Sequence, residues 1–236
     1  PFSGKPVWKG SCAIVVEVHR AVKAARSALE DWRSRSVTDR IRFLEVFARL
    51  VRENKAALAE TISRETGKPL WESHSEIDAM ANKVSLSIDA YHERRKVVRF
   101  ETGGTVSAVH YRPIGVLAVL GPFNIPGHIP NGHIVPALLS GNTVVFKPSE
   151  YTPAVGEKTM TLWEAAGLPA GVLNLIQGGK ETGALLAEAD GLDGLLFTGS
   201  YKTGSVLHRL FAGHPEKMLA LELGGNNPLV VFEASD

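Results

Sequence analysis

The sequence predicts an α/β protein with a parallel sheet and helices on both of its faces. Downstream of residue 113, short apolar runs alternate with amphipathic segments, the pattern of strand–helix–strand units joined by right-handed crossovers. The 34 residues from Pro113 to Phe146 contain no Asp, Glu, Lys or Arg, as expected for two strands covered on both faces and the crossover between them. Five prolines and five glycines in this stretch exclude a single membrane-spanning helix.

The first hundred residues are predicted to be helical. An Ala-rich, basic helix is expected over Val15–Trp32, and apolar residues recur at helical spacing from Val37 to Thr66. Thr38 is a candidate N-cap for the second segment, and Gly67, followed closely by a proline, is a stop signal. A further helix is expected over Glu76–Arg95, and the basic run at its end is interpreted as a solvated helix end.

From residue 101 onward the pattern changes to short β-branched segments separated by Gly and Pro. The alternation from Thr102 to Arg112 predicts an exposed strand or a hairpin arm. Strands are predicted at Ile114–Leu120, Thr143–Phe146, Val172–Ile176, Gly194–Phe197, Met218–Leu221 and Leu229–Phe232. Helices between them are predicted at about Pro130–Leu139, Ala154–Ala166, Glu181–Ala189 and Thr203–Phe211.

A sheet of this kind binds its ligands at the carboxyl ends of its strands. Four of the predicted strands end in, or are followed by, polar or glycine-rich segments, at Gly121–Pro126, Lys147–Glu150, Thr198–Ser200 and Glu222–Gly225. The sequence therefore places its candidate functional residues along one edge of the sheet.

Gly199 to Gly204 reads Gly-Ser-Tyr-Lys-Thr-Gly at a junction between strand and helix. Free backbone N–H groups and the helix dipole suit a phosphate there, although an ordinary glycine turn explains the pattern as well. The chain has no Gly-x-Gly-x-x-Gly, and Gly178–Gly183 is not a P-loop because Ala184 stands where lysine is required.

Lys147 and Glu150 flank a proline-fixed turn after a buried strand. The turn is either a solvated loop or a binding site for the ribose of a dinucleotide. In the second case the lysine donates to ribose hydroxyls and the carboxylate accepts from the 2′-hydroxyl. Because that carboxylate would repel a 2′-phosphate, the residues favour NAD over NADP.

Two further residues are candidates for catalysis. Asn124 lies between Phe123 and two prolines, and its side-chain amide either forms a hydrogen bond within the turn or is a preorganised donor to an oxyanion. Glu222 interrupts an apolar run, and is interpreted either as a buried general base with a raised pKa or as a carboxylate pointing out from a strand edge. His128 and His133 are five residues apart, which is poor geometry for a shared metal, so no metal site is predicted.

The charge balance and the cysteine content limit the classes of binding partner and the cellular location that the sequence predicts. Against 26 basic residues stand 25 acidic ones, and the net charge of +1 gives no global field for nucleic acid or an anionic membrane. The chain contains one cysteine, Cys12, so it has no internal disulfide, and a reduced, cytoplasmic location is expected. The first ten residues lack the apolar run of a signal peptide.

Taken together, these segments resemble the aldehyde dehydrogenase superfamily along essentially the whole chain. Each motif is weak alone, but five in the right order are specific. They are Glu65–Pro69, Gly121–Pro126, Gly141–Glu150, Phe197–Ser200 and Leu221–Pro228. Within that superfamily, Gly127–Pro136, Asn174–Gly179 and Pro215–Lys217 resemble the branch that oxidises N-succinylglutamate 5-semialdehyde in bacterial arginine catabolism.

The resemblance implies a Rossmann-like fold and a mechanism in which a cysteine thiolate adds to the aldehyde, hydride leaves for NAD, and water hydrolyses the thioester. It assigns the oxyanion to Asn124 and water activation to Glu222. The implied cofactor-binding residues are Leu120, Gly121, Pro122, Phe123, Lys147, Glu150, Gly199, Ser200, Tyr201, Lys202, Thr203, Gly204 and Leu223.

The resemblance also implies a domain plan. Residues 1–100 and 113–224 form the NAD-binding domain, 101–112 an oligomerisation arm, and 225–236 the start of a catalytic domain. The family's nucleophile lies tens of residues beyond Glu222, whereas Cys12 precedes every motif. We therefore expect the cofactor-binding part of a longer, homo-oligomeric enzyme acting on a small aldehyde, inactive alone and with an apolar face that promotes association.

Two alternatives remain open from the sequence. The chain could be a stand-alone nucleotide-binding or partner-binding module without turnover, or part of a related enzyme with a different aldehyde substrate or with NADP.

Overall fold

A computed structural model describes residues 4–233 of the chain. The outermost residues of the predicted segments 1–100 and 225–236 lie outside the described part. In chain order, the helices are α1 (Val15–Ser34), α2 (Val37–Glu53), α3 (Lys55–Thr66), α4 (Leu70–Arg94), α5 (His128–Leu139), α6 (Pro153–Ala165), α7 (Lys180–Ala187) and α8 (Tyr201–Phe211). The strands are β1 (Val98–Thr102), β2 (Thr105–Val109), β3 (Val116–Leu120), β4 (Thr143–Lys147), β5 (Leu173–Leu175), β6 (Gly194–Gly199) and β7 (Met218–Leu223).

The core of the fold is a parallel sheet of five strands in the order β5-β4-β3-β6-β7. All of β3 and β4 is buried, which confirms the prediction drawn from the uncharged stretch. The predicted strand at Leu229–Phe232 is wrong. That segment is irregular and its four side chains are 68–90% exposed, because the chain leaves the sheet after β7 and pairs with no strand among residues 4–233.

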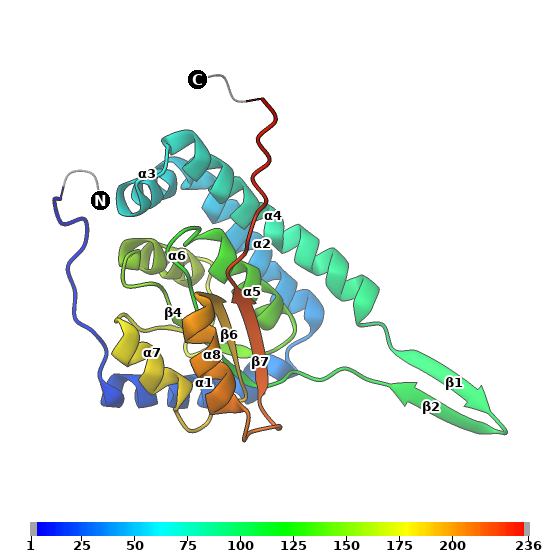
Figure 1. The fold of residues 1–236 in the computed structure, drawn as a ribbon. Coiled ribbons are helices and arrows are strands. Elements are labelled where there is room, and N and C mark those ends of the chain that lie inside the picture. Colours follow the sequence, from blue (N-terminus) through cyan, green and yellow to red (C-terminus); the bar gives the residue numbers. More distant parts are fainter. Residues whose placement is uncertain (1–3, 234–236) are drawn as a thin grey trace.

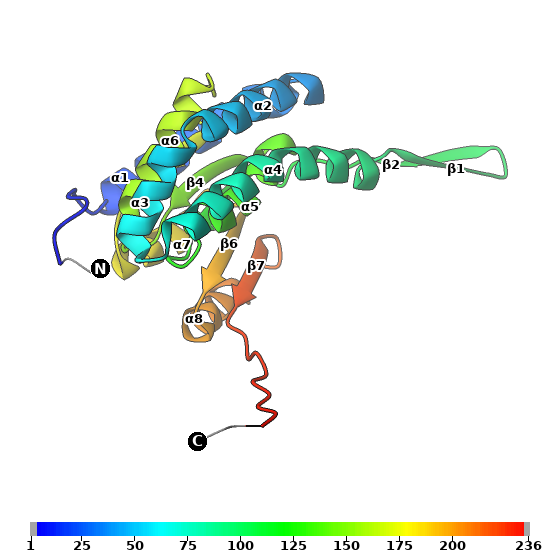
Figure 2. The ribbon, with the colours of Figure 1, turned by 90° about the horizontal axis from the view of Figure 1, so that it is seen from above.

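Helices cover both faces of this sheet (Figures 1 and 2). Helices α5 and α6 pack on one face with α2, α3 and α4 outside them, and α1, α7 and α8 pack on the other. Successive β3 side chains alternate between the two cores: Leu117 and Val119 face the α5–α6 side, whereas Val116, Ala118 and Leu120 face the α1–α7–α8 side. Each strand of the sheet's centre is therefore buried by both helical layers.

The N-terminal helices differ in detail from the prediction. The segment predicted from Val37 to Thr66 is two helices that meet at Asn54. Ser36, rather than Thr38, is the N-cap, because its hydroxyl accepts the Asp39 N–H at 3.1 Å. Gly67 ends α3 with φ of 79°, a left-handed conformation that glycine adopts without strain.

A two-stranded antiparallel hairpin, β1–β2, projects away from the body (Figure 1). It begins at Val98, earlier than the predicted arm of residues 101–112, and every residue of both strands is exposed. Arg95 anchors its base: the guanidinium lies 5.4 Å from the ring centroids of both Tyr91 and Tyr111 and donates to the Arg112 carbonyl at 3.3 Å. Its role in oligomerisation stays a prediction.

Candidate functional site

The candidate site lies where the strand order reverses. From β3 the chain proceeds outward through β4 and β5, then returns to place β6 on the other side of β3. Loops leaving the carboxyl ends of β3 and β6 therefore diverge, and the crevice between them is where sheets of this type bind ligands. The segments after β3, β4 and β6, which the sequence singled out, all lie at this edge.

The first loop, residues 121–127, is fixed at both ends. Gly121 donates its N–H to the Lys147 carbonyl at 3.0 Å, and a Cβ at Gly121 would approach the Pro130 side chain to 2.8 Å. At the other end, the N–H groups of Gly127 and His128 donate to the Glu76 carboxylate. Asn124 lies exposed between these two anchors. A short loop held at both ends gives its amide a defined place, as an oxyanion donor requires.

Phe123 and Tyr151 come from neighbouring loops and meet edge to face. Their ring centroids are 5.8 Å apart with an interplanar angle of 79°, and both rings are more than half exposed. The loop after β3 and the loop after β4 are therefore in direct contact at the candidate site.

Lys147 is the most deeply buried basic side chain at this edge, with 6% of its surface exposed. Its Nζ donates to the carbonyls of Pro148 at 2.7 Å and Gly178 at 2.8 Å. Burial lowers the pKa of this ammonium, and the negative charge of the exposed Glu150 partly opposes that effect. An ammonium has three N–H donors, so one is left for a ligand.

The segment after β6 forms a capped helix start. Ser200 is the N-cap of α8, and its hydroxyl accepts the Thr203 N–H at 3.2 Å. Gly204 faces the Leu223 side chain so closely that a Cβ there would displace it, whereas Tyr201 and Lys202 are exposed. The predicted junction of strand and helix is confirmed; phosphate binding by its N–H groups stays a prediction.

Glu222 lies on β7, and the interpretation of it as a buried carboxylate is wrong: the residue is exposed. The physical reason is that β7 is the outermost strand and its main helix contact is with α8, on the opposite face. By alternation, Glu222 lies on the same face as Met218 and Ala220, the α5 side, beyond the part of the sheet that α5 and α6 cover. The second interpretation is therefore right about exposure, but the side chain projects from a face of the sheet and not from its edge. In the parallel register, Glu222 lies beside Thr198 of β6.

His133 reaches this corner from α5. Its Nε2 lies 3.4 Å from the Thr198 hydroxyl. Burial lowers the pKa of this imidazole, the charge of Lys83 lowers it further, and the charge of Glu222 raises it. The sequence had considered His133 only as a metal ligand, and its spacing gave no signal of this contact.

Two buried carboxylates behind the site were also missed. Glu65 accepts the N–H groups at the start of α6, and Glu76 those at the start of α5. Their signal in the sequence was the motif Glu65–Pro69 and, for Glu76, an acidic residue on the buried face of a helix.

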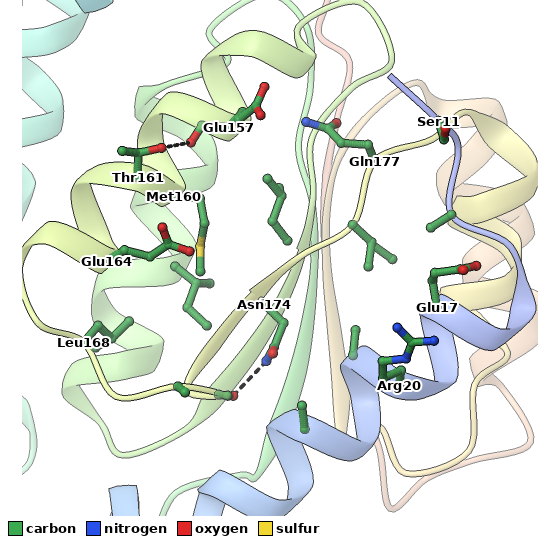
Figure 3. Close-up of a pocket in the computed structure, with 18 of the residues that line it drawn as sticks. Ser11, Glu17, Arg20, Glu157, Met160, Thr161, Glu164, Leu168, Asn174 and Gln177 are labelled. Atoms are coloured by element: carbon green, nitrogen blue, oxygen red, sulfur yellow. Dashed lines mark hydrogen bonds between the residues drawn. The ribbon is translucent and has the colours of Figure 1, made fainter. Parts of the chain in front are cut away.

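A separate hollow of about 920 Å³ lies away from these loops, between α1 and α6 along the free edge of β5 (Figure 3). Met160 and Leu168 line it on one side, and Glu17 and Arg20 of α1 on the other (Figure 3). Cys12, an exposed free thiol, also lines it. No strand-end residue of the candidate site contributes to this hollow.

Residues 4–233 contain no cluster of three or more His, Cys, Asp or Glu side chains arranged to hold a metal ion. Within the same range, none of the helices combines the length and the apolar character needed to cross a membrane.

The parallel sheet and the polar residues at the carboxyl ends of its strands together define an α/β protein of the class that binds nucleotides at those strand ends. The aldehyde dehydrogenase family profile matches residues 1–236, and the chain belongs to that family. The family implies a nicotinamide cofactor.

Individual relatives support the same assignment. The chain is 56% identical over 233 residues to N-succinylglutamate 5-semialdehyde dehydrogenase of Vibrio cholerae serotype O1, covering 99% of the chain and 48% of the relative. The crystal structure of an apo indole-3-acetaldehyde dehydrogenase has a TM-score of 0.91 at 32% identity, with 97% of this chain and 55% of that one covered. Glyceraldehyde-3-phosphate dehydrogenase GapN from Methanocaldococcus jannaschii, complexed with NADP, has a TM-score of 0.89 at 26% identity, covering 95% and 49%. The chain thus spans about half the length of the curated relatives it matches.

Proposed function

We propose that this chain is the cofactor-binding part of an enzyme that oxidises N-succinylglutamate 5-semialdehyde to N-succinylglutamate with NAD. The observation that carries the proposal is the 56% identity, over 99% of the chain, to an enzyme of that name. Further support comes from the sheet edge at which Asn124, Lys147 and Ser200 lie, since sheets of this type bind their ligands there. A cytoplasmic location and assembly through the β1–β2 arm belong to the same proposal.

The residues present fit a dinucleotide. Lys147 holds its ammonium between two carbonyls, and its remaining donor would bind a ribose hydroxyl, while the exposed Glu150 would accept from the 2′-hydroxyl. Gly199, Ser200 and the first turn of α8 would hold the pyrophosphate. Leu120 to Phe123 and Leu223 lie at the strand ends that border the crevice. When bound, NAD supplies a hydride acceptor.

Asn124 and Glu222 contribute the chemistry of this chain. A cysteine thiolate from the remainder of the enzyme adds to the aldehyde carbon, and the Asn124 amide donates to the oxygen as negative charge develops on it. After hydride loss leaves a thioester, Glu222 removes a proton from the water that attacks the acyl carbon, and the thiolate leaves. The nucleophile is assigned to the remainder of the enzyme because Cys12 lines the hollow beside α1 and α6, whereas Asn124 lies on the loop after β3 and Glu222 on β7.

The decisive experiment assays the full-length enzyme with N-succinylglutamate semialdehyde and with aldehydes of other charge and length, recording NADH formation. We expect the highest kcat/KM for the succinylated semialdehyde. A higher value for an uncharged aldehyde would contradict the substrate assignment.

Cofactor choice is tested by calorimetry on the same protein. A carboxylate near a 2′-phosphate costs about 1–4 kcal/mol at the dielectric constants of a protein surface. Glu150→Gln should therefore tighten NADP binding about tenfold and leave NAD binding within about threefold. Glu164→Gln, an exposed carboxylate on α6, is the control. Equal affinities for the two cofactors in the unmodified protein would contradict NAD preference.

A nucleotide-binding module without turnover is the second candidate, favoured because Cys12, the one cysteine of the chain, lines the hollow beside α1 and not the loops that carry Asn124 and Glu222. It predicts that the 236-residue chain binds NAD by itself. Binding by the isolated chain, with no activity in any longer product, would favour this candidate over the first.

A further inference from the structure

The turn between α3 and α4 carries the motif Glu65–Pro69, to which the proposed reaction assigns no role. Gly67 ends α3 in a left-handed conformation, and the Ser63 hydroxyl donates to the Lys68 carbonyl at 2.8 Å across the turn. The turn is thus rigid, and Glu65 and Lys68 leave it on either side of Gly67.

Glu65 caps a helix that lies far along the chain. It is 8% exposed, and its two carboxylate oxygens accept the N–H groups of Ala154 at 2.8 Å and Val155 at 2.9 Å. These are first-turn donors of α6, and Thr152, the local N-cap residue, makes no side-chain cap. Since α6 follows directly on the turn that carries Lys147 and Glu150, Glu65 fixes the end of the ribose-binding loop.

Glu76 does the same for α5. One oxygen accepts the N–H groups of Gly127 at 2.7 Å and His128 at 3.2 Å, and the other accepts from Lys68 Nζ at 2.7 Å. Only 3% of the Glu76 side chain is exposed. Because α5 follows the loop that carries Asn124, Glu76 fixes the end of the oxyanion loop, and Lys68 neutralises the buried charge.

A local serine or aspartate would cap either helix at a lower cost of desolvation. Here both caps instead come from one neighbouring turn and the helix after it, at sequence separations of 89 and 51 residues. A single rigid element therefore sets the positions of two loops relative to each other, which local caps cannot do.

We propose that Glu65 and Glu76 are positioning residues, Glu65 for the ribose-binding loop and Glu76, through its pair with Lys68, for the loop of Asn124. This inference rests on the proposed function and adds two separable roles to it. Loss of Glu65 should weaken cofactor binding, whereas loss of Glu76 should slow thioester formation.

The test compares Glu65→Gln and Glu76→Gln in the full-length enzyme, with exposed carboxylates on the same helices, Glu60→Gln on α3 and Glu93→Gln on α4, as matched controls. Three quantities are measured: the Kd for NAD, the rate of the NADH burst at saturating NAD, and stability to urea. The unmodified enzyme must first form NADH from the aldehyde in its first turnover; the absence of any NADH would refute the proposed function and not this inference.

For Glu65→Gln we expect a Kd for NAD that rises about fivefold to tenfold with the saturated burst rate within about twofold. For Glu76→Gln we expect a burst slowed at least about tenfold, since a 1 Å misplacement of a catalytic group can cost about 10²-fold, with the Kd for NAD within about twofold. The inference would be overturned if both variants lost stability to urea and the Kd for NAD and the burst rate either changed equally or did not change.

If Glu76→Gln fails to fold, a milder change replaces it. Lys68→Met leaves in place the hydrogen bonds that the N–H groups of Gly127 and His128 donate to Glu76, and removes the ion pair with Glu76 together with a 4.0 Å contact to the exposed Glu72. It should slow the burst and leave the Kd for NAD unchanged. A burst rate equal to that of the unmodified enzyme would refute the role of the pair.

Discussion

The substitution Gly127→Ala should destabilise the protein, although its backbone conformation suits alanine. Gly127 has φ of −86°, so no backbone strain opposes the change. A Cβ there would, however, lie 2.6 Å from Met80 Sδ, 3.1 Å from Glu76 Oε1 and 3.4 Å from Ile62 Cδ1. All three neighbours are buried, and the carboxylate is held by bonds on both oxygens.

The size of the loss in stability depends on the buried groups that must move to make room for the new methyl group. Inserting a methyl into a packed core typically costs about 1–3 kcal/mol, and displacement of Glu76 would weaken its bond to the Gly127 N–H by about 1 kcal/mol more. We therefore expect Gly127→Ala to lower the free energy of unfolding by about 2–4 kcal/mol. The assay is urea denaturation followed by tryptophan fluorescence.

Gly132→Ala is the matched control on the same helix. A Cβ at Gly132 would meet only Lys83 Cε, at 3.9 Å, which is ordinary contact. Alanine inside a helix is favoured over glycine by about 0.5–1 kcal/mol, so this variant should be slightly more stable than the unmodified protein. The reasoning would be refuted if the two substitutions shifted the unfolding midpoint in the same direction by similar amounts.

Three further predictions concern a binding residue, the histidines and the core. Lys147→Met, which keeps the apolar stem, should weaken NAD binding about tenfold, whereas Lys23→Met, the control at an exposed position, should not. Calorimetry measures both affinities, and an unchanged Kd for Lys147→Met would contradict the proposed contact of Lys147 with the ribose. Burial lowers the pKa of His128 and His133 from 6.5, so in the unfolded protein these imidazoles bind protons that they do not bind in the folded protein. Their contribution to stability is therefore present above pH 6.5 and is lost as the pH falls through the pKa values of the folded protein. His133→Asn should flatten that decline in urea titrations, and an identical decline would exclude His133 as its source. Phe47 is fully buried and stacks on Trp163 with ring centroids 3.7 Å apart, so Phe47→Ala should lower the free energy of unfolding by about 3–5 kcal/mol, against no more than about 0.5 kcal/mol for Leu86→Ala at an exposed position on α4. Equal losses in denaturation would show that burial does not set the cost.

Much of the fold was predictable because its signals are local. An uncharged stretch broken by prolines and glycines identified β3, α5 and β4, and helical spacing identified α1, α2 and α3. The junction at Ser200 was predictable for the same reason, since a strand end, a cap and a helix start lie within a few residues. The break at Asn54 was missed because α2 and α3 each carry apolar residues at helical spacing, and the spacing gave no sign of a break between them.

For the candidate site, the sequence could predict which residues lie at the strand ends but not how exposed each of them is. Strand ends gave Asn124, Lys147 and Gly199, because the carboxyl edge of a parallel sheet follows from the order of elements. The exposure of Glu222 did not follow, since it depends on which strand is the outermost, and strand order is a property of the whole sheet.

By itself, the sequence determined the α/β class, the edge of the sheet that carries the polar groups, and the family to which those groups belong. Only the tertiary structure decided that Lys147 is buried between two carbonyls, that Glu222 is exposed, and that Glu65 and Glu76 hold the two loops. The physical reason is distance along the chain: periodicity and turn chemistry act over a few residues, whereas burial and the pairing of Glu65 with Ala154 arise only when segments 89 residues apart pack together.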